Sequence, residues 1–123
     1  MSMAAEFTRE LDRLASEQGI EISAIITRSG APLAWHLPAG LSSETIATLS
    51  ATIFGASEVI FTGSGWNKPI KVSVESALGG VMVTRSLGRK AILVLMSKNM
   101  NIAQLEAKSA EAEINIKKVM QDE

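Results

Sequence analysis

The stretch KAILVLM, residues 90–96, decides the fold, because its last six side chains are all apolar. A strand with one face in water alternates apolar and polar residues, whereas a strand covered on both faces is apolar throughout. This run therefore predicts a central strand with a layer of structure on either side. Periodicity alone leaves open a short buried helix at the same place.

Alternating polarity and turn residues predict four more strands around this one. Ile70, Val72 and Val74, for example, alternate with polar residues, which indicates a strand with one buried face. Short turns connect most of these segments, and they favour antiparallel pairing in one five-stranded sheet. The four strands are expected at residues 20–27, 32–37, 70–75 and 81–85.

Three helices complete the predicted order. The first has Ser2 at its N-cap and Gly19 just past its end, and both residue types are favoured there. The helices are expected at residues 3–18, 42–61 and 101–120. The order helix, strand, strand, helix, strand, strand, strand, helix predicts an α+β protein with helices on both faces of one antiparallel sheet. We expect a single domain over residues 1–123.

The composition restricts the kinds of partner. The chain has 123 residues, 46% of them hydrophobic, which is enough for one domain with its own core. Twelve basic and 13 acidic residues give a net charge of −1, so the basic field that nucleic-acid binding requires is missing. The absence of cysteine excludes disulfides and a thiol nucleophile. Because the apolar runs look too short for a bilayer and the N-terminal segment is charged, we expect a cytoplasmic protein without membrane insertion.

The helix predicted at residues 42–61 carries apolar residues on more than one side. One stripe consists of Ile46, Leu49, Ile53, Ala56 and Ile60, and a second consists of the small residues Ala47, Ala51 and Gly55. The first stripe can cover the protein's own core, and the second lets another backbone approach closely, which favours a protein interface. The alternative is that the small stripe packs on the protein's own sheet while Thr45, Thr48 and Thr52 face water.

Several local strings lie at the expected turns and strands. They are residues 19–26, RSGAPLA at 28–34, GGVMVTR at 79–85, and residues 91–96 followed by LEA at 105–107. Together with the order of elements, they resemble the Roadblock family of dynein light-chain-type domains, which have a profilin-like sheet with helices on both sides. Members usually dimerise through the second helix and the third strand. Many bind or regulate small Ras-like GTPases or serve as scaffolds in motor and signalling complexes.

The resemblance and the helix pattern together predict a homodimer that binds a small Ras-like GTPase. The expected interface residues are Ala47, Thr48, Ala51, Thr52, Gly55, Ile70, Val72 and Val74. The expected docking residues for the partner are Thr45, Arg85, Arg89 and Lys90. For the three basic residues near the last hairpin, a solvated tip is the alternative. Trp66 has no place in the family pattern.

No residue pattern points to catalysis. His36 is the only histidine, and no companion residue completes a transition-metal site or a general base around it. Gly63 and Gly65 precede a strand and lack the pattern of a phosphate-binding loop. We therefore expect no enzyme activity, no cofactor and no metal. The alternative functions are a structural scaffold without a GTPase and a small-ligand sensor, and the low aromatic content argues against the sensor.

Overall fold

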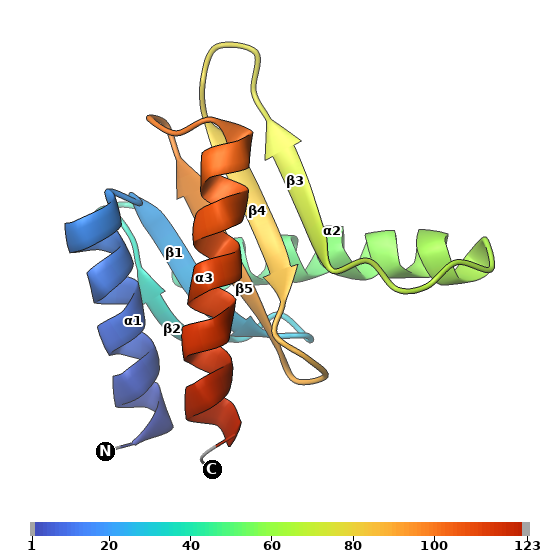
Figure 1. The fold of residues 1–123 in the computed structure, drawn as a ribbon, viewed down its shortest axis with the longest axis horizontal. Coiled ribbons are helices and arrows are strands. Elements are labelled where there is room, and N and C mark those ends of the chain that lie inside the picture. Colours follow the sequence, from blue (N-terminus) through green and yellow to red (C-terminus); the bar gives the residue numbers. More distant parts are fainter. Residues whose placement is uncertain (1, 122–123) are drawn as a thin grey trace.

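The computed structural model describes residues 2–121 and has the predicted elements in the predicted order. The helices are α1 (Met3–Gln18), α2 (Ser43–Gly63) and α3 (Ile102–Gln121). The strands are β1 (Ile22–Thr27), β2 (Pro32–His36), β3 (Lys71–Glu75), β4 (Val81–Ser86) and β5 (Ala91–Ser97). They form one antiparallel sheet in the order β2-β1-β5-β4-β3. Because α1 and α3 cover one face and α2 crosses the other (Figure 1), the predicted fold class is confirmed.

β5 is the central strand that its sequence predicts. It lies between β1 and β4 in the sheet. Ile92 and Val94 belong to the core beside α2, whereas Leu93 and Leu95 belong to the core beneath α1 and α3. All four side chains are buried, which explains why this strand is apolar on both faces.

α1 and α3 cover the larger of the two cores. Leu11 of α1 and Leu105 and Ile116 of α3 are fully buried there. Gly19 adopts the left-handed conformation (φ +70°) that ends α1, and this conformation is one that glycine tolerates best. The chain can therefore turn sharply from α1 into β1.

α2 covers the smaller core and lies close to the β1–β2 turn. Ala47, Ala51 and Phe54 pack there against side chains of β1 and β5. At Gly30 in the turn (φ +98°), an added Cβ atom would lie 3.1 Å from the Cα atom of Thr48. The helix can approach this closely because the residues at the contact are small.

Candidate interaction surface

The two sides of α2 differ in exposure. Its buried residues are Ala47, Ser50, Ala51 and Phe54. Its strongly exposed large apolar residues are Leu49, Val59 and Ile60, at 58%, 71% and 65% exposure. A helix that is apolar all round but covered on one side only has apolar surface left for a partner.

The structure divides both predicted stripes between the two sides of α2. Ile46 of the first stripe packs against the core, as expected, and Gly55 of the second has open space beside it. Ala47 and Ala51, expected at an interface, pack on the protein's own sheet, which is the alternative that the sequence left open. Leu49 and Ile60, expected over the core, point away from it. The reason is the close β1–β2 turn at Gly30, because only small side chains let the helix approach it.

The other predicted residues of α2 lie nearer the outer side. Thr45, Thr48 and Thr52 are exposed, and Gly55 is half-buried with open space where a Cβ atom would be. The Thr52 hydroxyl donates to the carbonyl of Thr48 at 2.9 Å, so it is already partnered within the helix. These residues keep surface that a second chain can reach.

α2 is longer than the sheet is wide, and its C-terminal part continues past β3 (Figure 1). Val59 and Ile60 belong to the C-terminal part of α2 and are strongly exposed. Just beyond the helix, the Trp66 ring packs edge-on against Phe61, with centroids 5.6 Å apart and planes at 89°. Trp66 remains 66% exposed, so the end of the overhang is an aromatic tip. The sequence pattern did not predict that Trp66 lies at this tip. How far α2 extends past the sheet depends on the width of the sheet, which the pattern does not give.

β3 adds a strand edge to this surface. Among the strands of residues 2–121, it pairs with β4 alone. Ile70 just before β3 and Val74 within it are exposed, whereas Val72 is half-buried against the core beside α2. The predicted strand residues therefore lie at an open strand edge, and Val72 lies on the face of the sheet that α2 covers.

The predicted docking cluster of three basic residues is not a single surface. Arg85 is buried, and its guanidinium donates to the Ser109 hydroxyl (2.9 Å) and to the Glu113 carboxylate (3.1 Å). Its place in β4 directs it towards α3, so its assignment as a docking residue is wrong. Arg89 and Lys90 are exposed at the β4–β5 hairpin, and these two remain available.

Arg28, which the sequence pattern did not single out, ties α2 to the hairpin. Its guanidinium donates to Glu58 of α2 (2.8 Å) and to the Ser86 hydroxyl and the Gly88 carbonyl, both at 2.7 Å. It also lies over the Phe54 ring, 5.2 Å from the centroid. These contacts set the position of α2 on the sheet, and Glu58 is used inside the protein.

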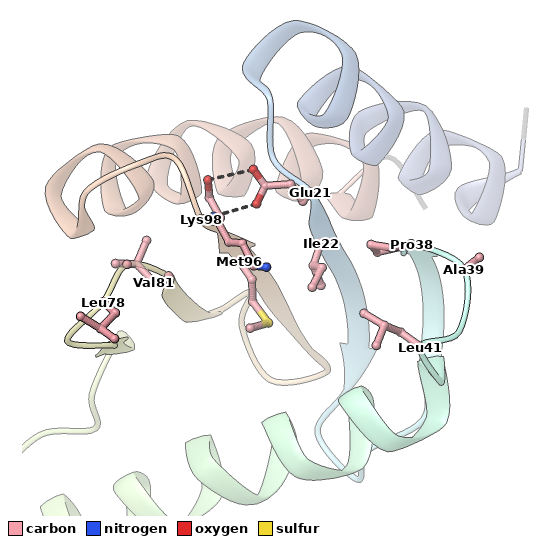
Figure 2. A pocket seen from close by; sticks show the side chains of 12 residues that line it. Glu21, Ile22, Pro38, Ala39, Leu41, Leu78, Val81, Met96 and Lys98 are labelled. Carbon is pink, nitrogen blue, oxygen red and sulfur yellow. Dashed lines mark hydrogen bonds between the residues drawn. The ribbon is translucent and has the colours of Figure 1, made fainter.

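An apolar groove of about 640 Å³ lies beside α2 on the same face of the sheet (Figure 2). Ile22, Met96 and Leu41 point into it. The acid at its rim, Glu21, accepts the backbone N–H of Lys98 at 2.7 Å. Because that carboxylate is already bonded within the chain, the groove offers mainly apolar contacts.

The described part of the chain holds no group of three or more His, Asp or Glu residues that could bind a metal. His36 is exposed, with its Nδ1 atom 3.4 Å from the Asp12 carboxylate. Between β3 and α3, the hydrogen bond from the Ser73 hydroxyl, together with the charge of Lys71, lowers the pKa of Glu106. The carboxylates of Asp12 and Glu106 thus take part in ion pairs and hydrogen bonds within the chain.

By length and composition alone, α2 is apolar enough to cross a membrane, which corrects the expectation that every apolar run is too short. Such a helix is weak evidence for a span, since helices of soluble proteins meet the same criteria. Here Phe54 is buried on the sheet and Glu58 is paired with Arg28. A helix that packs on its own sheet with one side and on a partner with the other would have the same apolar composition as a membrane span.

A five-stranded antiparallel sheet with one crossing helix beside an open edge strand is the architecture of a Roadblock-type domain. The chain belongs to the Roadblock/LC7 domain family, whose model matches residues 7–97. The sequence has no match among curated proteins.

Solved structures show the same architecture at low sequence identity. MglB of Myxococcus xanthus has a TM-score of 0.89 at 14% identity and covers 99% of this chain and 92% of its own. The gliding protein MglB of Thermus thermophilus has a TM-score of 0.84 at 16% identity, over 100% and 94% of the two chains. An MglB structure with a tetrameric arrangement has a TM-score of 0.85 at 17% identity, over 99% and 93%. At these identities the similarity establishes a shared fold.

Proposed function

We propose that this chain is a non-enzymatic cytoplasmic interaction module that forms a homodimer through α2 and β3 and that scaffolds or regulates a small Ras-like GTPase. The observation that carries the proposal is the exposed side of α2, where Leu49, Val59 and Ile60 lie uncovered. The same protein has an open strand edge at β3. The tetrameric arrangement of MglB, which has this fold, supports self-association.

The energetics of such a dimer are favourable. Burial of an exposed Leu or Ile side chain contributes ~1.5–3 kcal/mol. In a two-fold dimer each protomer contributes the same patch, so Leu49, Val59 and Ile60 count twice. Together with backbone pairing at the strand edge, this burial offsets association costs of ~4–15 kcal/mol.

Sedimentation equilibrium of charge variants tests the homodimer. Leu49→Glu and Ile60→Glu place a carboxylate in the proposed interface, and we expect both variants to be monomers with an intact circular dichroism spectrum. Ile114→Glu is the matched control, because Ile114 is 60% exposed on α3, away from this surface. It should remain a dimer. A monomeric wild type at high concentration, or folded variants that still dimerise, would rule the interface out.

The family resemblance supports the GTPase partner. Within residues 2–121 we find no phosphate-binding loop, so any effect on hydrolysis would come from positioning the GTPase's own switch residues. A surface arginine that acts in trans is the other route. Because Arg85 is buried, Arg89 on the exposed hairpin is the candidate for that role.

Hydrolysis assays with small GTPases encoded near this protein's gene test the second half of the proposal. We expect the dimer to bind one of them and to change its rate of GTP hydrolysis or nucleotide exchange. Loss of the rate effect with binding intact in Arg89→Ala would assign the trans role to this arginine. If no GTPase binds and co-purified partners contain none, the chain is a structural scaffold.

A further inference from the structure

The free edge of β3 presents the backbone groups of alternate residues. In the β3–β4 hairpin, the N–H of Ser76 donates to the carbonyl of Gly80 at 2.9 Å. In antiparallel strands the backbone groups of successive residues point to opposite sides. Even-numbered residues of β3 therefore bond to β4, and Lys71, Ser73 and Glu75 present their N–H and C=O groups to the open edge.

The sequence of this strand, KVSVE at residues 71–75, is symmetric about Ser73. A valine stands on each side of Ser73, and the next positions outward are Lys71 and Glu75, which carry opposite charges. When two copies pair antiparallel about Ser73, Lys71 of each copy lies opposite Glu75 of the other, and the valines face one another. Opposite charges and β-branched residues directly across two strands stabilise their pairing.

The faces of the two sheets match in this register. Ser73 and Lys71 lie on the α3 side, where the Ser73 hydroxyl donates to Glu106 at 2.7 Å and the Lys71 Nζ atom is 3.6 Å from the same carboxylate. Val72 lies on the α2 side. A register slip of one residue would set Lys71 opposite Val74 or Ser76, according to its direction, and turn the two sheets to opposite faces.

Two neighbouring registers keep the faces but lose the charge pairs. With the two-fold axis one residue earlier, Glu75 lies opposite Pro69, which has no N–H to donate. With the axis one residue later, Lys71 lies opposite Ala77. Only the register centred on Ser73 combines outward-facing backbone groups with two pairs of opposite charge.

We infer that the two copies of β3 pair in the register centred on Ser73, and that Lys71 and Glu75 are the residues that make this self-recognition register specific. This inference rests on the proposed homodimer and adds its register, its two-fold axis and the residues that specify them. Glu75 is exposed and forms no ion pair with any residue of the described chain, so its charge is available to Lys71 across the axis.

The same axis gives the overhang of α2 a place to pack. Within one chain, α2 lies beside the half of β3 that contains Val72. A two-fold rotation about Ser73 brings the C-terminal part of the other copy's α2, with Ile60, and Trp66 just beyond that helix, beside the half that contains Val74. The apolar groove of Figure 2 lies on that same face. Side chains that are exposed in the single chain thus meet one another in the pair.

Charge reversal tests the inference by sedimentation. Glu75→Lys sets lysine opposite lysine, and Lys71→Glu sets glutamate opposite glutamate, twice in each dimer. We expect the dissociation constant of each variant to rise about tenfold, because like charges directly across two strands repel. An equimolar mixture of the two variants, and the double variant with both changes, should recover the wild-type dissociation constant. The matched control Lys118→Glu changes the charge equally on the last turn of α3 and should dimerise normally.

Cross-linking reads the register directly, because the chain has no cysteine of its own. In Ser73→Cys the two thiols lie on residues directly opposite, with Cα atoms about 5.5 Å apart, which a disulfide spans. In Glu75→Cys they lie about 13 Å apart. We expect oxidation to cross-link the first variant only.

The outcomes separate the register from the homodimer. Dimers unaffected by charge reversal, or cross-linking through Glu75→Cys in place of Ser73→Cys, would overturn the self-recognition register while the homodimer through α2 stands. A monomeric wild type would remove both. If Lys71→Glu unfolds beside Glu106, Glu75→Lys with its control Lys118→Glu, and the two cysteine variants, still decide.

Discussion

The two faces of the sheet differ in how completely helices cover them. On one face α1 and α3 lie over the larger core, and among their described residues only Ile114 is a strongly exposed large apolar side chain. On the other face α2 crosses alone (Figure 1). Exposed apolar side chains lie on this helix and on the segments just before and after it in the chain. They include Leu41, Leu49, Val59, Ile60, Trp66, Ile70 and Val74.

This difference separates folding from association. The covered face buries most of its apolar residues within one chain, so it stabilises the monomer. The open face buries only part of α2 within the chain, and the rest of that helix is available to a partner. Substitutions on the inner side of α2 should therefore change stability, whereas those on its outer side should change self-association.

The largest expected effect is on the core of the open face. Phe54 is fully buried there, so Phe54→Ala should lower the free energy of unfolding by ~3–5 kcal/mol. Leu105→Ala provides the comparison on the covered face, with an expected loss of ~2–5 kcal/mol. Urea unfolding at one fixed protein concentration measures both, since dimerisation makes stability depend on concentration. A loss below about 1 kcal/mol for Phe54→Ala would show that α2 is not part of the cooperative core.

A pair of glycines sharpens the contrast between the two sides of α2. Gly30→Ala puts a Cβ atom against the backbone of α2 at a positive φ, so the free energy of unfolding should fall by ~1–3 kcal/mol. Gly55 lies in the helix with open space around the same position, so Gly55→Ala should raise it by ~0.5–1 kcal/mol. Thermal unfolding of the two variants checks the signs. Equal losses in both would contradict the placement of Gly55 away from the sheet.

The smallest expected effect concerns acid stability on the covered face. The pKa of Glu106 is lower in the folded protein, through the Ser73 hydroxyl and Lys71, than its ordinary value of 4.5. A carboxylate with a lowered folded pKa stabilises the protein above its unfolded pKa and loses this contribution as the pH falls through the folded value. Glu106→Gln should therefore cost at most ~1 kcal/mol at pH 7. The deficit should shrink below about pH 4.5 in acid titrations of unfolding, and a deficit that grows there would contradict the assignment.

Most of the fold was predictable because the sheet determines which strand residues must be apolar. The continuous apolar run of β5 required a layer on each side, and the alternation in β3 required one buried face. Ser2 and Gly19 marked the ends of α1 for local reasons of capping and backbone conformation. These patterns depend on neighbours along the chain, so sequence reasoning can reach them.

The candidate site was less predictable, as α2 and Arg85 show. α2 is apolar on both stripes, so periodicity cannot tell which stripe lies on the sheet, and the close approach at Gly30 settles it. Arg85 resembles its neighbours Arg89 and Lys90 in sequence, yet it is buried against Glu113. The contacts that decide both cases join residues far apart in the chain.

The amino-acid sequence by itself determined that five strands and three helices form a two-faced sheet, that α2 has more apolar surface than one contact can cover, and that β3 carries opposite charges placed symmetrically about Ser73. Only the tertiary structure decided which side of α2 is buried, that this helix extends past the sheet, and that β3 is an edge strand. The physical reason is that pattern and propensity act between neighbours in the chain, whereas exposure depends on the elements that pack against each side chain.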